Sequence, residues 1–178
     1  MLMSYAGIGS RKTPDDILKM MTQLGVLLAN DGLTLVTGAA LGADQSFAMG
    51  ALSVGGRVKL HIPWKNYEYQ WWKDLDAEVS ILSPDDTDAY DSVKKHHPAY
   101  DRLSRGAIML HARNYNIIRD SDFVVHWAPK GKPGGTGQGL KIAIMQGKTI
   151  YDLGTPDDYN KVLKLLTDRK AELLRLKN

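Results

Sequence analysis

A glycine-bearing junction between an apolar run and a helix-forming run constrains the fold of this 178-residue chain more than any other feature. Residues 37–44, with the sequence TGAALGAD, follow the apolar run 33–36 and precede an Ala/Met/Leu-rich run at 45–52. These patterns predict a buried strand followed by a helix. Small residues at such a junction leave the backbone N–H groups of the helix N-terminus open to a ligand. Together with the helix dipole, those groups favour an anion, most often phosphate.

A second junction repeats this pattern later in the chain. Residues 131–139, with the sequence GKPGGTGQG, lie between a predicted strand at 123–127 and a predicted helix at 140–146. Two strand–glycine–helix junctions predict one phosphate-bearing ligand held between them.

Strand and helix patterns alternate from the start of the chain, which predicts an α/β protein of a single domain. We expect strands at residues 3–8, 33–36, 58–62, 79–82, 123–127 and 149–151. The fold class is a Rossmann-like parallel sheet with helices on both faces. Right-handed crossovers would bring Gly9, Gly38 and Pro63 to the rim formed by the C-terminal ends of the strands, where ligands bind in such sheets.

Helix signals add detail to this prediction. Thr13 and Pro14 are expected to begin the first helix, with Asp16 completing a capping box. Residues 90–120 are predicted to be helical, and residues 156–178 are predicted to form a C-terminal helix. The apolar residues of the first helix recur at helical spacing and should face the sheet: Ile17, Met20, Met21, Leu24, Leu27 and Leu28.

Composition excludes several classes of protein. The chain has no cysteine, which excludes a disulfide framework, a thiolate nucleophile and a cysteine-ligated zinc site. We expect neither a membrane span nor a signal peptide, because no apolar run approaches ~20 residues and the N-terminus lacks a basic flank. These features favour a cytoplasmic protein. The formal net charge of +3 permits binding to polyanions without requiring it.

Four motifs resemble a known family. They are Gly9-Ser10-Arg11, residues 37–44, Arg113-Asn114 before a hydrophobic strand, and Gly134-Gly135-Thr136. In their order and spacing they resemble the Rossmann domain of DNA-processing protein A (DprA/Smf). That domain belongs to the wider Smf/Lonely Guy (SLOG) superfamily, which also includes the Lonely Guy phosphoribohydrolases and molybdenum-cofactor carriers. The resemblance covers residues 5–152.

The resemblance implies a domain that binds single-stranded DNA, usually as a homodimer, and passes it to a recombinase. The chain contains neither the N-terminal helical domain nor the C-terminal winged-helix domain of many family members, so we expect a stand-alone version. Carried over by position, the family's ligand pocket would be lined by Gly9, Ser10, Arg11, Gly38, Ala39, Gly42, Asp44, Arg113, Asn114, Gly134, Gly135 and Thr136.

The chemistry of these residues agrees with a phosphate ligand but leaves alternatives open. Arg11 and Arg113 have planar, permanently charged guanidinium groups that suit phosphate oxygens. Asp44 either accepts a hydrogen bond from a ribose hydroxyl or caps its helix. Arg113 and Asn114 are alternatively the exposed end of a surface helix. The glycines at 38 and 42 alternatively serve only a tight turn.

Two further groups of side chains lie near the predicted rim. An aromatic cluster follows the strand 58–62, and it either stacks a nucleobase or packs a loop onto the body of the protein. The members of this cluster are Trp64, Tyr67, Tyr69, Trp71 and Trp72. A basic track beside the pocket is predicted from Lys12, Lys130, Lys132 and Lys141.

The residues favour a binding protein over an enzyme. The Lonely Guy enzymes cleave the N-glycosidic bond of a nucleoside monophosphate with an Arg and with a Glu that follows their glycine turn. Here the corresponding positions hold Gly139, Leu140 and Lys141. Glycoside hydrolysis relies on a carboxylate, so we expect no catalytic residue of that kind. No cofactor or metal site is expected either, because the histidines show no ligand spacing beyond the adjacent pair at 96 and 97.

Two main hypotheses of function remain, beside a third in which the protein is a structural subunit with a vestigial pocket. The first is a DprA-like module that binds single-stranded DNA or a phosphorylated nucleotide at the rim, in DNA recombination or processing. The alternative is a small-molecule protein, either a nucleotide binder or sensor or an N-glycosidase of the Lonely Guy type. Binding to DNA should weaken steeply with salt, because several phosphates release counterions, whereas a mononucleotide pocket should be only mildly sensitive.

Overall fold

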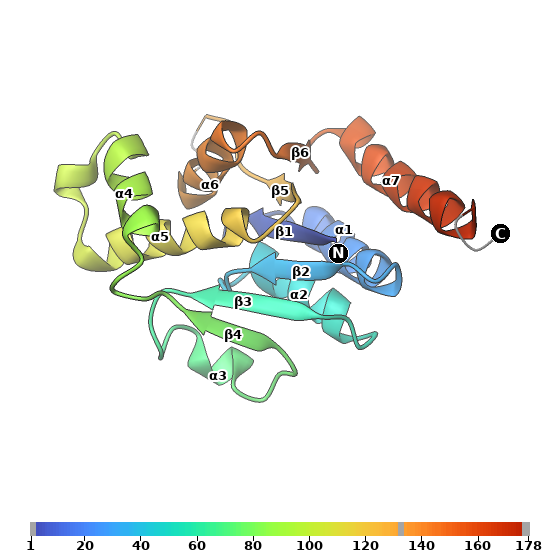
Figure 1. Cartoon of the computed structure of the whole chain (residues 1–178), viewed down its shortest axis with the longest axis horizontal. Helices are drawn as coiled ribbons and strands as arrows, with labels where there is room; N and C mark the ends of the chain where they lie inside the picture. Colours follow the sequence, from blue (N-terminus) through green and yellow to red (C-terminus); the bar gives the residue numbers. More distant parts are fainter. Residues whose placement is uncertain (1–2, 132–133, 176–178) are drawn as a thin grey trace.

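A sheet of six parallel strands forms the centre of the protein (Figure 1). The computed structural model describes residues 3–131 and 134–175. The strands are β1 (Ser4–Gly9), β2 (Thr34–Thr37), β3 (Val58–Ile62), β4 (Glu78–Ile81), β5 (Phe123–Trp127) and β6 (Thr149–Asp152). The helices are α1 (Asp15–Asn30), α2 (Ala43–Leu52), α3 (Tyr69–Trp72), α4 (Thr87–His96), α5 (Arg105–Arg119), α6 (Gly134–Met145) and α7 (Pro156–Arg175), with a 3₁₀ turn at Tyr100–Arg102.

The order of the strands confirms the predicted Rossmann-like α/β fold. The strands lie in the order β4-β3-β2-β1-β5-β6, and every neighbouring pair is parallel. The chain therefore builds outward from β1 to β4 and then returns to place β5 on the other side of β1. In open parallel sheets, ligands bind beyond the C-terminal ends of the strands where the order reverses in this way. That point lies between β1 and β5.

Helices cover both faces of the sheet because successive residues of each strand point to opposite sides. On one face Tyr5 and its neighbours pack against α1, α2 and α7. On the other face Ala6, Val36 and Val124 pack against α5 and α6. Helix α4 packs on α5 through a smaller cluster that includes Val93 and Ala112. Figure 1 shows α5 running across one face of the sheet and α1 and α2 behind the other.

The start of the first helix differs from the prediction. Helix α1 begins at Asp15, and no side chain caps its N-terminus. Thr13 instead donates a hydrogen bond from Oγ1 to the carbonyl oxygen of Ser10, at 2.6 Å. The predicted capping box is therefore wrong, because Thr13 closes the loop after β1. On the same helix, Leu27 is 39% exposed rather than facing the sheet, whereas Met21, Leu24 and Leu28 are buried.

The stretch predicted to be helical at 90–120 is interrupted. It contains the end of α4, the 3₁₀ turn and α5. The break lies at Pro98, because a proline disfavours helical geometry in the residue before it. His97 accordingly adopts an extended conformation, with φ −91° and ψ 117°. The C-terminal helix begins at Pro156 as predicted and is described as far as Arg175.

The second glycine stretch also differs from the prediction. Helix α6 begins at Gly134, six residues before the expected start at 140. Most of the predicted glycine loop is therefore the first turns of a helix. None of the helices in the described part of the chain is long and apolar enough to cross a membrane.

Candidate functional site

A cavity of about 820 Å³ opens at the point where the strand order reverses. The loop after β1 and residues 129–131 after β5 form two of its sides, and one side of α5 forms a third. The cavity brings together most of the predicted site residues: Gly9, Ser10, Arg11, Asp44, Arg113, Asn114, Gly134, Gly135 and Thr136.

The other three predicted residues shape the loop after β2 and are not among the residues that line the cavity. Gly38 lies under the guanidinium of Arg113, since a Cβ at this position would stand 1.1 Å from Nη1 of Arg113. Ala39 and Gly42 have φ angles of 65° and 96°, so both turn the chain through left-handed conformations. Gly38 therefore provides room for the guanidinium of Arg113.

Arg113 and Asp44 form a buried ion pair at the base of the cavity. Nη1 of Arg113 lies 3.4 Å from Oδ2 of Asp44, and each residue is only 5% exposed. The same carboxylate oxygen accepts a hydrogen bond from the backbone N–H of Ala40 at 3.1 Å. Burial raises the pKa of Asp44, and Arg113 opposes that shift. The interpretation of Arg113 as the exposed end of a surface helix is therefore wrong.

Tyr67 connects the two arginines of the cavity. Nη2 of Arg11 donates a hydrogen bond to the Tyr67 hydroxyl at 3.2 Å, and Cζ of Arg113 lies 5.6 Å from the centre of the Tyr67 ring. Indole N–H of Trp72 donates to the carbonyl oxygen of Tyr67 at 2.7 Å, and Trp64 packs edge-on against the ring at 5.5 Å. Tyr67 is consequently held in one orientation.

The aromatic cluster thus divides into two groups. Tyr67 lines the cavity, whereas Trp71 and Trp72 pack against the hydrophobic core. The alternative in which the cluster packs a loop onto the protein is therefore right for these two tryptophans. Tyr67, named in the sequence analysis only as a member of the cluster, is a residue of the candidate site. Its signal was its position shortly after β3, at the same rim as the glycine junctions.

The N-terminus of α6 opens into the cavity through Gly134, Gly135 and Thr136. The first four N–H groups of a helix have no partner within the helix. The first turn of α6 contains no acidic residue, whereas α1 and α7 each carry two. Asn114 joins α5 to this turn, because its Nδ2 donates to the carbonyl oxygen of Gly135 at 3.2 Å. The positive end of α6 is therefore not offset by a carboxylate of its own first turn.

Positive charge dominates the described lining of the cavity. Arg11, Lys12, Lys130 and Arg113 line it, and the acidic residue among the described lining is Asp44, which pairs with Arg113. Of the predicted basic track, Lys12 and Lys130 therefore reach the cavity. Lys141 is exposed on α6 outside the lining, and Lys132 lies outside the described residues.

His111, the histidine that the sequence places near Arg113, is a second lining residue outside the predicted set. It follows Leu110 on the side of α5 that faces the cavity. Burial lowers its pKa to about 4, with smaller contributions from His97 and Arg113, so its imidazole is neutral at pH 7. The ring of His97 lies 4.7 Å from it. Within residues 3–131 and 134–175, no group of three or more histidine, aspartate or glutamate side chains is placed to hold a metal ion.

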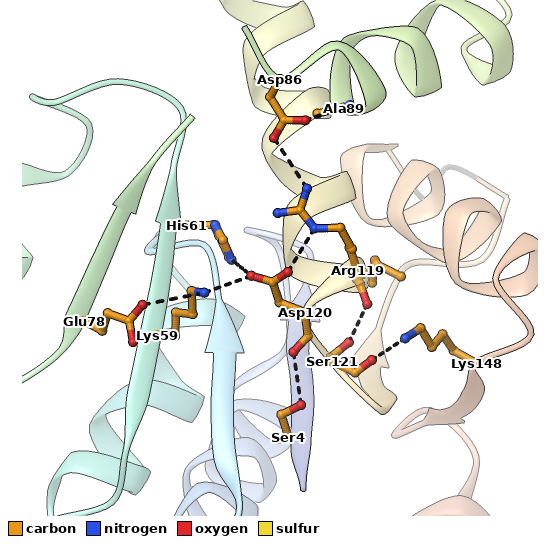
Figure 2. Close-up of polar contacts among 11 residues, drawn as sticks. Ser4, Lys59, His61, Glu78, Asp86, Ala89, Arg119, Asp120, Ser121 and Lys148 are labelled. Atoms are coloured by element: carbon orange, nitrogen blue, oxygen red, sulfur yellow. Dashed lines mark hydrogen bonds and ion pairs between the residues drawn. The ribbon is translucent and has the colours of Figure 1, made fainter. Parts of the chain in front are cut away.

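A polar cluster anchors the far end of α5 (Figure 2). Oδ2 of Asp120 lies 2.9 Å from both Nζ of Lys59 and Nε2 of His61, which extend from β3. Oδ1 of Asp120 accepts from Nε of Arg119 at 3.0 Å, and Arg119 also pairs with Asp86 at the start of α4. Asp120 lies about 10 Å along α5 from Arg113, so the cluster orients the helix without touching the cavity.

The comparisons with known proteins agree with this fold. No protein-family model matches the chain. An uncharacterised protein of Archaeoglobus fulgidus is 26% identical over 155 residues, which are 87% of this chain and 82% of that protein.

Several solved structures are similar in three dimensions. DNA processing protein A from Helicobacter pylori, which binds single-stranded DNA, matches with a TM-score of 0.64 and 18% identity over 97% of this chain and 80% of its own. The molybdenum cofactor binding protein of Rippkaea orientalis matches with a TM-score of 0.61 and 22% identity over 94% and 86%. DNA processing protein A from Streptococcus pneumoniae matches with a TM-score of 0.61 and 19% identity over 92% and 56%. The chain shares their fold.

The polar cluster predicts that the protein loses stability in mild acid. Burial lowers the pKa of His61 to about 4 from its ordinary 6.5, although Asp120 opposes the shift. Burial raises the pKa of Asp120, but hydrogen bonds from Lys59 and Arg119 outweigh it and bring this pKa to about 2. Because the pKa of His61 is lower in the folded state than in the unfolded state, His61 stabilises the fold at pH values above the unfolded pKa of 6.5. The contribution of His61, about 3 kcal/mol, should therefore be lost as pH falls from 6.5 towards 4.

Urea unfolding at pH 7 and pH 4.5 measures this loss. His61→Gln is the matched variant, because an amide donates to Asp120 but does not titrate in this range. The free energy of unfolding should fall less with pH in the variant than in the wild type. Because His111 has a similarly lowered pKa, part of the loss should persist. Equal losses in both proteins would contradict the assignment to His61.

Proposed function

We propose that the protein binds a phosphorylated nucleotide in the cavity, with the phosphate at the N-terminus of α6. The main support for this proposal is that the first turn of α6 lines the cavity and contains no acidic residue. Gly134 and Gly135 are exposed at the cavity wall, where their N–H groups are available to an anion. Lys12 and Lys130 line the same cavity, and their charges complement the negative charge of a phosphate.

A buried nitrogen of Arg113 adds support for a polar ligand. Nε of Arg113 is buried and has no hydrogen-bond partner among the described residues. A buried donor without a partner costs roughly 1–3 kcal/mol, so a ligand or water that accepts from it stabilises the site. Asp44 already engages the other side of the guanidinium.

The size and walls of the cavity suit a single nucleotide. Its volume of about 820 Å³ lies within the range of sites for small molecules and cofactors, roughly 300–1,000 Å³. Ile8, Leu110 and Ile117 supply apolar surface beside the charged residues. Such a combination provides a face for a sugar or base and a separate place for phosphate. The protein would act as a nucleotide binder or sensor.

Single-stranded DNA is the second candidate ligand. Lys12 and Lys130 are exposed where they line the cavity, so further phosphates of a strand would meet positive charge beyond the first. A role in DNA recombination or processing would follow, with a homodimer that hands DNA to a recombinase. The likeness in fold to a protein that binds single-stranded DNA supports this candidate.

Nucleotide N-glycosidase activity has less support. The positions expected to supply a catalytic glutamate hold Gly139, Leu140 and Lys141. Asp44, the acidic residue of the described lining, is buried against Arg113. The reaction needs a carboxylate at the sugar, and Asp44 is engaged elsewhere.

Gly135→Val tests the position of the phosphate. A Cβ at Gly135 would meet only Nδ2 of Asn114, at 3.9 Å, so the substitution fits the fold. Its branched side chain would lie at the helix N-terminus where the phosphate is proposed to bind. Calorimetric titration with AMP and with GMP should show at least a tenfold loss of affinity. The free energy of unfolding should stay within about 0.5 kcal/mol of the wild type.

Gly106→Val is the matched control. Gly106 occupies the same place in the first turn of α5, and the nearest atoms to a Cβ there are those of Trp64 at 3.9 Å. It does not line the cavity. Its affinity for nucleotides should equal that of the wild type. Normal binding by Gly135→Val would place the phosphate away from α6.

Fluorescence anisotropy separates the two candidate ligands. A labelled single-stranded oligonucleotide is titrated at low and moderate salt, with unlabelled nucleoside monophosphates as competitors. If one nucleotide fills the site, a monophosphate should displace the oligonucleotide and the affinity should change little with salt. Tight binding that resists monophosphates and weakens steeply with salt would contradict the nucleotide proposal and favour DNA.

A further inference from the structure

The end of the cavity opposite α6 is formed by Tyr67 and Arg11. Tyr67 follows β3, whereas α6 follows β5, and β2 and β1 lie between these two strands. Arg11 follows β1, so the pair lies on the β1–β3 side of the cavity, whereas α6 lies on the β5 side. A phosphate bound at α6 leaves the Tyr67–Arg11 end to another part of the same ligand.

This end presents hydrogen-bond donors. The Tyr67 hydroxyl accepts from Arg11 at 3.2 Å, so its own proton remains available to donate. Arg11 has five N–H donors, and the contacts of the described residues use only the one to Tyr67. A ligand group placed here meets two adjacent donors.

The acidic side chain of this region, Asp44, is already engaged by other protein groups. The side chain of Asp44 is 7% exposed, and its Oδ2 already accepts from the backbone of Ala40 and from Arg113. The contacts of Tyr67 with Trp64, Trp72 and Arg113 keep its hydroxyl at a fixed place on the wall. The selectivity of this end therefore depends on acceptors in the ligand.

We propose that the Tyr67–Arg11 pair selects nucleotides whose base carries a keto oxygen, the 6-oxopurines, over 6-aminopurines. The inference rests on the proposed function, since it assigns the base end of a ligand whose phosphate lies at α6. Guanine and hypoxanthine present two acceptors, O6 and N7, on one edge. Adenine presents a donor, N6–H₂, in place of O6. A donor facing the Tyr67 hydroxyl and Arg11 leaves polar groups unpaired, and sites built to form such hydrogen bonds reject ligands that cannot.

Competition binding with GMP, IMP and AMP tests the inference. The wild type should bind GMP and IMP roughly tenfold more tightly than AMP, the discrimination expected of paired hydrogen bonds to one base edge. Tyr67→Phe removes the hydroxyl but keeps the ring that packs on Trp64 and Arg113. It should weaken GMP and IMP towards the affinity for AMP and leave AMP itself unchanged. Tyr69→Phe is the matched control, because Tyr69 is 42% exposed and does not line the cavity.

Each other outcome overturns a defined part of the account. Equal affinities for GMP and AMP in the wild type overturn the inference and leave the proposed function standing. Tighter binding of GMP than of IMP also overturns it, because the 2-amino group would then be the feature recognised. A preference that persists in Tyr67→Phe excludes the hydroxyl as its source. Failure of all three nucleotides to bind overturns the proposed function, and the inference with it.

Discussion

The buried ion pair between Arg113 and Asp44 joins parts of the protein that lie on opposite faces of the sheet. Asp44 stands in the first turn of α2, on one face, and Arg113 stands on α5, on the other. The guanidinium crosses the rim above Gly38, and a Cβ at this position would collide with it. Removing one partner of such a pair costs roughly 3–5 kcal/mol, because the other charge remains buried without compensation. The loop after β2 and the cavity wall on α5 are therefore coupled.

Helix α5 organises the rest of the site in the same way. Its side chains form one wall of the cavity, and Asn114 fixes the first turn of α6 against it. Its far end is held by Asp120 against Lys59 and His61 of β3 (Figure 2). The helix is thus attached to α6 through Asn114 and to β3 through Asp120, so Arg113 and Asn114 are held in place before a ligand arrives. Such preorganisation lowers the cost of binding.

The sequence predicts the fold well because its signals are local. Alternating apolar runs and helical periodicity identify each strand and most helices, and the parallel order then brings the glycine junctions to one rim. The placement of Arg11, Asp44 and Gly135 at one cavity follows from that rim, whereas Asn114 was expected there only from the family resemblance. The start of α6 is less predictable, since glycine has low helix propensity and Gly134, Gly135 and Gly137 nevertheless form its first turn.

The roles of individual residues depend on contacts between distant segments, which a local pattern does not contain. The partner of Arg113 is 69 positions away in the sequence, so nothing beside Arg113 indicates its burial. Tyr67 lies at the cavity, where its hydroxyl accepts a hydrogen bond from Arg11, 56 positions away in the sequence. Thr13 has the sequence of a helix cap, but the carbonyl of Ser10 is a closer partner for its hydroxyl. For Arg113 and Tyr67 a contact between distant segments decides the role, whereas for Thr13 one local hydrogen bond replaces another.

Amide chemical shifts in a ¹H–¹⁵N correlation spectrum, followed while GMP is added, test most directly whether the phosphate binds at the N-terminus of α6. The largest changes should occur at the amides of Gly135, Thr136 and Gly137, with further changes at Arg11 and Tyr67. Saturating shifts confined to another region, such as the groove that Asp88 and Met145 line between α4 and α6, would contradict this placement of the phosphate.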